Sequence, residues 1–147
     1  MLLKQIPFAA ILLMFSCSNP GTDNTAAADN TPYSNETGTG KFTTVAVSVN
    51  LDQSLADKGQ LIFENKCVAC HKRTNEKLIG PGLQGITTRR KAGWILNLLT
   101  NTDAMLNYDP QLRAQMEKYQ VRMPDADVSE DEARSVYEFL RKNDGVK

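Results

Sequence analysis

The feature that most constrains this chain is a short segment in which two cysteines stand three apart and a histidine follows directly. The segment is Cys67-Val68-Ala69-Cys70-His71. At the end of a helix, two cysteines with this spacing lie on one side, and the adjacent histidine can turn its ring toward the same space. Such a group could bind zinc, form a redox-active or structural disulfide, or hold a larger cofactor through both sulfurs.

The rest of the sequence separates these alternatives. A zinc site needs three or four ligands, whereas the chain has one histidine and no second cysteine pair. A thioredoxin-like redox pair belongs to a βαβ pattern, which we do not find, and a structural disulfide would leave His71 without a role. The segment is the attachment signature of a c-type haem. We therefore expect one covalent haem c, bound by Cys67 and Cys70, with His71 ligating its iron.

Residues 1–16 have the layout of an export signal. Lys4 precedes an apolar run over residues 6–15, which is too short to cross a bilayer of about 30 Å as a permanent helix. Residues 13–17 end in a small serine followed by Cys17, and they resemble the lipobox of bacterial lipoproteins. The resemblance implies that Cys17 is lipidated and anchors the protein on the periplasmic side of a bacterial membrane. The alternative is an ordinary secretory signal that leaves Cys17 free or removes it.

The remaining chain divides into a linker and one domain. Residues 17–50 are rich in Thr, Asn, Ala, Gly and Ser, a composition that predicts a flexible linker behind Cys17. Within it, residues 42–49 alternate in a way that favours a short strand. The 147 residues fit one compact core, which we place at residues 51–147. Lysines plus arginines equal the acids at 17 each, so the charge balance argues against a nucleic-acid partner.

Helical signals fill residues 51–147. We expect helices from a cap at Ser54 or Asp57 to Cys67, around residues 94–99, from Asp109-Pro110 through Tyr119, and from the capping box at Ser129 to about Asn143. Gly59 lies inside the first of these at a cost of about 1 kcal/mol relative to alanine. A glycine in that position suggests that another helix crosses closely there.

Four elements occur in an order that resembles a small class I cytochrome c with His/Met ligation. They are the haem attachment segment, Ile79-Gly80-Pro81-Gly82-Leu83, Arg122-Met123-Pro124 and the amphipathic C-terminal helix. The resemblance covers residues 52–143. It implies an all-α fold in which the N- and C-terminal helices cross beside one covalently bound haem.

The resemblance also implies specific contacts. Gly59 and Phe63 of the first helix would meet Val136 and Phe139 of the last. The backbone carbonyl of Pro81 would accept a hydrogen bond from His71 Nδ1. Such an acceptor fixes the tautomer and the orientation of a ligating imidazole.

The second axial ligand implied by the resemblance is Met123, which lies in a proline-marked loop just before the last helix. A thioether opposite histidine saturates the iron and suits reversible electron transfer. Met105 and Met116 fall in helical segments, where methionine usually fills the core. Met105 as the ligand, or an iron with an open position, are the alternatives.

Two further features could serve the haem. Trp94 is either a core residue or a hydrogen-bond donor to a haem propionate, and Arg89, within Arg89-Arg90-Lys91, could neutralise a propionate or belong to a solvated face. Cations cluster around the haem-binding segment, with only Glu76 opposing them: Lys66, Lys72, Arg73, Lys77, Arg89, Arg90 and Lys91. This cationic cluster predicts an acidic redox partner. Because residues 125–132 are by contrast acid-rich, we also expect the molecule to have an electric dipole.

These features predict an electron carrier rather than an enzyme. We expect a monomer that passes single electrons from a quinol-oxidising donor complex to a terminal reductase or oxidase. Residues 89–109 resemble lipoprotein cytochromes associated with nitrous-oxide reductase in Bacteroidetes-type bacteria, which implies that copper enzyme as the acceptor and a haem-copper oxidase as its main rival. The alternative function is a haem peroxidase or a gas-sensing haem domain, which would need an open or displaceable sixth position.

Overall fold

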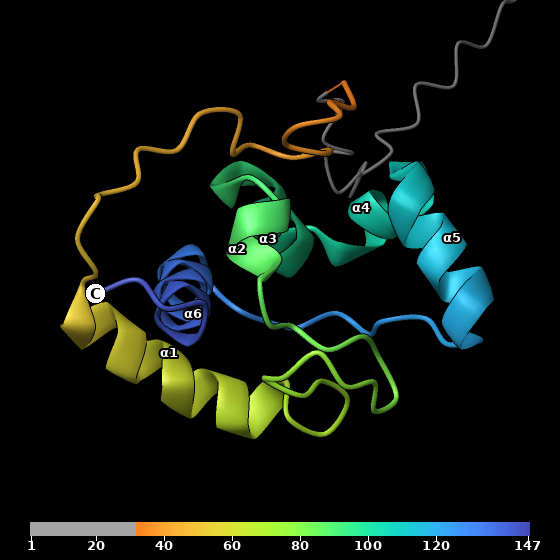
Figure 1. The fold of residues 1–147 in the computed structure, drawn as a ribbon. Coiled ribbons are helices and arrows are strands. Elements are labelled where there is room, and N and C mark those ends of the chain that lie inside the picture. Colours follow the sequence, from red (N-terminus) through yellow and green to blue (C-terminus); the bar gives the residue numbers. More distant parts are fainter. Residues whose placement is uncertain (1–31) are drawn as a thin grey trace, which may run out of the picture.

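The computed structural model describes residues 32–147, which contain six helices and no strand. The helices are α1 (Gln53–Lys66), α2 (Ile86–Arg89), α3 (Ala92–Thr100), α4 (Thr102–Tyr108), α5 (Pro110–Tyr119) and α6 (Glu130–Asn143). Figure 1 shows α1 running across α6, with α4 and α5 at the far side of α3. The predicted all-α fold is confirmed. The predicted signal peptide over residues 1–16 and the lipidation site Cys17 lie outside the described residues.

The crossing of α1 and α6 organises the fold. A Cβ atom on Gly59 would lie only 1.9 Å from the backbone oxygen of Ser135, so the two helices touch through their main chains at this point. One turn further along α1, the ring of Phe63 packs against Phe139 with 5.1 Å between centroids and a tilt of 45°. Val136 is 2% exposed beside them. The predicted contacts of Gly59 and Phe63 with the last helix are therefore confirmed.

Local signals mark the helix ends well. The Ser129 hydroxyl accepts from the backbone N–H of Glu132, and the Glu132 carboxylate accepts from the N–H of Ser129, which completes the predicted capping box of α6. Asp109 caps α5 by accepting from the N–H groups of Gln111 and Leu112. The predicted cap of α1 is wrong. Asp52 caps this helix by accepting from Leu55, so α1 begins earlier than a cap at Ser54 or Asp57 would place it.

Residues 33–49 form an N-terminal arm that packs against the helices. Thr39 and Phe42 of this arm are 2% and 5% exposed. The buried side chain of Asn97, in α3, accepts from the N–H of Phe42 (3.0 Å) and donates to the carbonyl of Thr37 (2.8 Å). These contacts differ from the expectation of a flexible linker up to residue 50. The packed part of the chain therefore starts well before Leu51.

The short strand expected over residues 42–49 is not formed. The β-bridge found in residues 32–147 joins Ser34 to Gly38 within a turn of the arm. Backbone groups that a strand would pair with a neighbouring strand are bound instead by side chains. The buried Arg141 of α6 donates to the carbonyls of Ser48 and Val49 while it pairs with Glu138. An extended, alternating segment therefore lies on helices without any sheet.

Gly59→Ala tests the helix crossing. The added methyl group would meet Ser135 backbone atoms that cannot rotate away, so α1 and α6 must separate. We expect the free energy of unfolding to fall by about 2–3 kcal/mol, the upper part of the range of about 1–3 kcal/mol seen when atoms are forced into a packed core. Lys58→Ala, at an exposed position of α1, is the matched control and should change this free energy by less than about 0.5 kcal/mol. Equal effects in denaturant titrations of both variants would contradict the crossing.

Asn97→Ala tests the attachment of the arm. The change removes one acceptor and one donor that hold the arm backbone, each worth about 1 kcal/mol net. We expect limited proteolysis to cut within residues 33–50 several-fold faster while the helices stay resistant. Asn107→Ala, on the exposed side of α4, should leave the cleavage rate unchanged. Arm cleavage that is equally slow in the Asn97 variant would show that the arm is held by other contacts.

Candidate functional site

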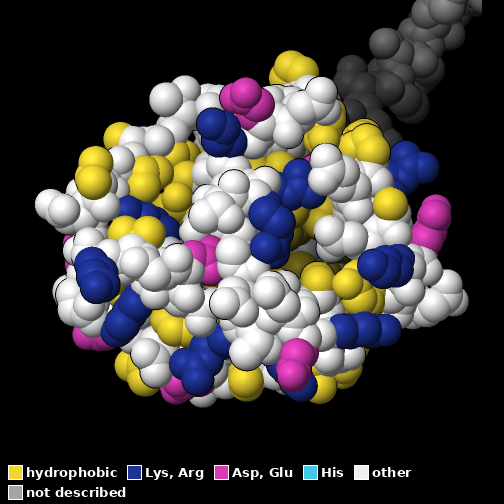
Figure 2. All heavy atoms as spheres, viewed as in Figure 1, with side chains coloured by type: hydrophobic (Ala, Val, Ile, Leu, Met, Phe, Trp, Pro, Cys, Tyr) yellow, Lys and Arg dark blue, Asp and Glu magenta, His cyan; other side chains and the backbone are white. Residues whose placement is uncertain are grey.

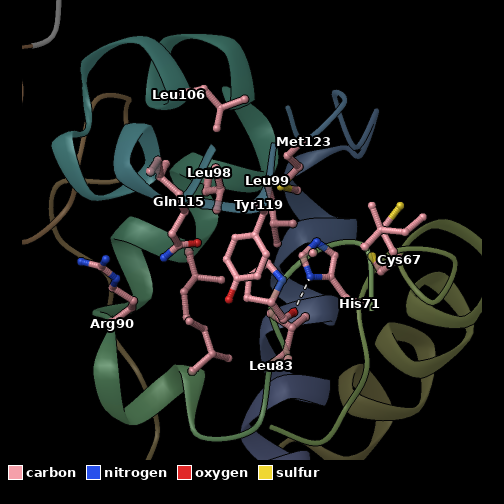
Figure 3. A pocket seen from close by; sticks show the side chains of 18 of the residues that line it. Cys67, His71, Leu83, Arg90, Leu98, Leu99, Leu106, Gln115, Tyr119 and Met123 are labelled. Carbon is pink, nitrogen blue, oxygen red and sulfur yellow. Dashed lines mark hydrogen bonds between the residues drawn. The ribbon is translucent and has the colours of Figure 1, made fainter. Parts of the chain in front are cut away.

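A cavity of about 490 Å³ opens between α1, α3, α5, α6 and the loops that join them (Figure 3). Its volume lies within the range of small-molecule and cofactor sites. Aliphatic and aromatic side chains make up most of its wall, including Phe63, Leu99, Leu106 and Val136. Cys67, Cys70, His71, Pro81, Arg89, Trp94 and Met123 also line it. The structure thus brings every haem-site residue predicted in this part of the chain to one cavity.

The two cysteines lie where α1 ends. Cys67 is the C-terminal cap of the helix, and its carbonyl accepts from the N–H groups of Cys70 (3.1 Å) and His71 (2.9 Å). This tight turn places both half-buried thiols and the imidazole on the same cavity wall. The cysteines are free rather than joined in a disulfide. Burial raises the pKa of Cys67 above that of an ordinary thiol, so before attachment its protonated form is favoured.

The orientation of His71 is set by one hydrogen bond. His71 Nδ1 lies 2.8 Å from the carbonyl oxygen of Pro81. Because a carbonyl can only accept, Nδ1 carries the proton, and Nε2 keeps a lone pair available to a metal. The predicted contact between His71 and Pro81 is confirmed. In Figure 3 this bond is drawn as a dashed line, with His71 entering the cavity.

Gly80 supports the same ring, a role that sequence reasoning missed. A Cβ atom at this position would lie 2.6 Å from His71 Cε1 and 3.0 Å from Nδ1. The N–H of Gly80 also donates to the carbonyl of Cys70 (2.9 Å), which closes the loop over the attachment segment. The motif Gly80-Pro81-Gly82 carried a signal for this role, because a glycine allows the backbone to approach another group closely.

Three methionines differ in their access to the cavity. Met123 lines it from the loop between α5 and α6. Met105 is fully buried in α4 and lies outside the cavity wall, where its sulfur accepts from the N–H of Thr39 (3.1 Å). The structure therefore supports Met123 over Met105, which fills the core as expected. Met116 also lines the cavity from α5, although its helical position had suggested core packing alone.

Trp94 acts as a buried wall of the cavity. It is 3% exposed, which favours the interpretation as a core residue. Its indole N–H donates to the carboxylate of Asp109 at 2.7 Å. The alternative prediction, that this N–H binds a haem propionate, is therefore wrong, because Asp109 already accepts its one hydrogen. The bond to Asp109 could not be seen in the sequence, where Asp109 was assigned only the helix cap.

Arg89 and Arg90 both reach the cavity but differ in their partners. The Arg89 side chain is exposed and donates to the carbonyl of Gln84 (2.6 Å) across the short helix α2. Arg90 is half-buried, stacks over the Trp94 ring with 4.2 Å from Cζ to the centroid, and donates to Gln111. Between the two arginines, Arg90 is the one built into the cavity wall. The choice of Arg89 from the sequence missed this difference because α2 was not predicted.

These residues fit a covalently bound haem. Two thiols, an imidazole nitrogen and a thioether converge on an apolar cavity, while residues 32–147 contain no cluster of three His, Cys, Asp or Glu side chains that could hold a bare metal ion. Cysteine sulfurs would hold the porphyrin by thioether bonds, and His71 Nε2 would bind the iron.

No helix in the described range is long and apolar enough to cross a membrane.

Comparisons with known proteins agree with this fit. The family model Cytochrome c matches residues 56–144. A solved cytochrome c from Rhodothermus marinus is 32% identical, with a TM-score of 0.68 over 71% of this chain and 90% of that chain. An engineered form of that cytochrome, bound to a carbene intermediate, is 31% identical, with a TM-score of 0.65 over the same shares of both chains.

A curated relative, the cytochrome c-553-like protein of Synechocystis, is 33% identical over 57 residues. The match covers 37% of this chain and spans about half of the length of that relative. The family match covers more than half of the chain, and the solved relatives share its fold. The chain therefore belongs to the cytochrome c family, with the class I fold, covalently attached haem c and haem-based electron transfer.

Proposed function

We propose that this protein is a membrane-anchored one-electron carrier in which Met123 is the second axial ligand. The observation that carries this proposal is the arrangement of the cavity. His71 is turned by Pro81 so that Nε2 faces the cavity, and the thioether of Met123 lies in the wall of the same cavity. An iron that is bound by both His71 and Met123 has no open position for a substrate. A filled sixth position suits electron transfer, whereas catalysis at a haem needs an open one.

Several residues of the chain would each have a separate role in electron transfer. A bound haem would take up and release one electron reversibly at its iron. Cys67 and Cys70 hold it covalently, and the hydrogen bond to Pro81 keeps the imidazole of His71 in one tautomer. The apolar wall excludes water, which limits the reorganisation that accompanies each change of charge.

Charges around the cavity support an acidic redox partner. Arg90 and Arg122 line the cavity, and the ammonium of Lys77 lies 5.0 Å from the centroid of Tyr119, another lining residue. Figure 2 shows lysine and arginine side chains spread over this face around a hollow with a hydrophobic floor. A cationic rim steers an acidic partner and speeds encounter without requiring tight binding.

Some predicted members of this rim have neighbours that reduce their effect. Lys72 pairs with Glu76 at 2.8 Å, and the ammonium of Lys66 donates to the carbonyl of Asp127 in the acid-rich segment. Exposed pairs of this kind contribute little to stability, yet they offset charge locally. Arg122 likewise pairs with Asp103 at 2.8 Å. The proposed encounter surface is therefore centred on Lys77 and Arg90.

The proposed setting is the periplasmic side of a bacterial membrane. A lipid at Cys17 would keep a monomeric haem domain close to its partners and raise their effective concentration. We propose a quinol-oxidising complex as the donor. Residues 89–109 resemble cytochromes associated with nitrous-oxide reductase, which supports that enzyme as the acceptor over a haem-copper oxidase.

Met123→Ala tests the axial ligand. In the oxidised wild-type holoprotein we expect the weak far-red absorption band typical of a thioether bound to ferric haem, and we expect the variant to lose it. The ferrous variant should also bind carbon monoxide. Met116→Ala is the matched control, because it removes the other methionine that lines the cavity, and the band should persist.

The same spectra separate the alternatives. A band that survives in the Met123 variant and disappears in the Met116 variant would assign the ligand to α5. A wild-type iron that is high-spin and binds carbon monoxide or peroxide would overturn the carrier and favour a sensor or an enzyme.

Gly80→Ala tests the support of the ligating ring. The added methyl group would overlap His71 Cε1, so the ring must tilt away from Pro81. We expect an altered low-spin electron paramagnetic resonance signal of the ferric form and about tenfold faster loss of axial coordination at raised temperature, in line with other changes beside ligating histidines. Pro81→Ala keeps the carbonyl acceptor and should leave the signal close to wild type. An unchanged signal in the Gly80 variant would show that the contact does not orient the ring.

A further inference from the structure

Asp109 is the most enclosed charged group beside the cavity. It is 0% exposed, and its two carboxylate oxygens receive four hydrogen bonds. Oδ1 accepts from the backbone N–H groups of Gln111 (2.8 Å) and Leu112 (3.0 Å). Oδ2 accepts from Trp94 Nε1 (2.7 Å) and from the hydroxyl of Tyr33 (3.3 Å). Helix capping uses only Oδ1, so Oδ2 has a separate set of partners.

The partners of Asp109 define its charge. Three of the four are N–H groups, which can only donate, and the Tyr33 hydroxyl is placed to donate as well. A protonated carboxyl group would need an acceptor for its own hydrogen, and among its partners in residues 32–147 only the Tyr33 hydroxyl, the longest contact at 3.3 Å, could serve, whereas four donors suit an ionised group. The site is therefore built for a carboxylate. In turn, burial first and then the charge of Asp109 raise the pKa of Tyr33.

This carboxylate reaches the cavity through one side chain. Trp94 lines the cavity and binds Asp109 at the edge of its indole ring. The guanidinium of Arg90 lies over the face of the same ring and is the nearby cation that opposes Asp109. Tyr33 approaches from the N-terminal arm, so Asp109 links the arm to the cavity wall.

We propose that Asp109 lowers the reduction potential of the haem, and that Tyr33 of the arm moderates this effect. The proposal rests on the proposed carrier function. Oxidation of the iron adds one positive charge to the haem, and a buried anion nearby stabilises that form. A donor to the carboxylate draws off part of its negative charge and weakens the stabilisation. Through Tyr33, the N-terminal arm would therefore influence the reduction potential of the haem.

Two variants that change the two ends of the hydrogen bond between Tyr33 and Asp109 should act in opposite directions. Asp109→Asn removes the charge, so at a fixed ambient potential the ratio of reduced to oxidised holoprotein should rise by about three- to tenfold. Tyr33→Phe leaves the carboxylate with one donor fewer, so the ratio should fall by up to about twofold. Tyr108→Phe is the matched control, since this tyrosine is 63% exposed and adjoins Asp109 in the sequence. It should leave the ratio unchanged.

Opposite signs distinguish an electrostatic role from a structural one. A loosened cavity would shift both variants in the same direction, and that result would overturn the proposal, as would an unshifted Asp109 variant. If Asp109→Asn does not fold, Tyr33→Phe decides alone: a lower ratio supports the proposal, and an equal or higher ratio overturns it. A wild-type protein that cycles reversibly while the variants fail these expectations would leave the carrier function standing. A wild type that does not cycle would overturn the carrier function itself.

Discussion

The contact that the rest of the structure depends on is the crossing of two helices through their main chains. Without a side chain on Gly59, α1 comes within contact of the backbone at Ser135 in α6. That approach brings Phe63 and Phe139 together, and it sets the position of the C-terminal end of α1 relative to α6. Because Cys67 caps α1, the crossing also fixes the position of the attachment segment relative to the cavity. The geometry of the site thus depends on the absence of a Cβ atom at Gly59.

The sequence predicted most of the elements whose cause is local, the cap of α1 at Asp52 being the exception. Ser129 and Glu132 cap α6 reciprocally, and Asp109 with Pro110 opens α5, because these bonds form between residues two or three apart. The spacing of Cys67, Cys70 and His71 was similarly sufficient for the attachment segment. In each case the partners are neighbours in the chain, so their spacing alone specifies the geometry.

What the sequence could not predict depends on partners far apart in the chain. The arm was taken for a linker because its composition is polar, yet Asn97 binds its backbone from 55 and 60 residues away. The Trp94 indole N–H was considered as a donor to a haem propionate because no neighbouring residue in the sequence indicated that Asp109 would accept its hydrogen. Arg89 was preferred to Arg90 because the short helix α2, which turns them apart, has no strong sequence signal. The errors at Asn97 and Trp94 concern contacts that form only once the chain is packed.

The size of the cavity has a consequence for the stability of the fold. Its volume is about 490 Å³, and most of its wall is apolar. At about 24 cal/mol for each Å³, a hollow of this volume in a polypeptide still lacking haem would cost at most about 12 kcal/mol. That is comparable to the entire stability of a small domain, about 5–15 kcal/mol. Filling this space would therefore offset a cost of the same order as the stability of the fold, so a bound haem would contribute to packing as well as to chemistry.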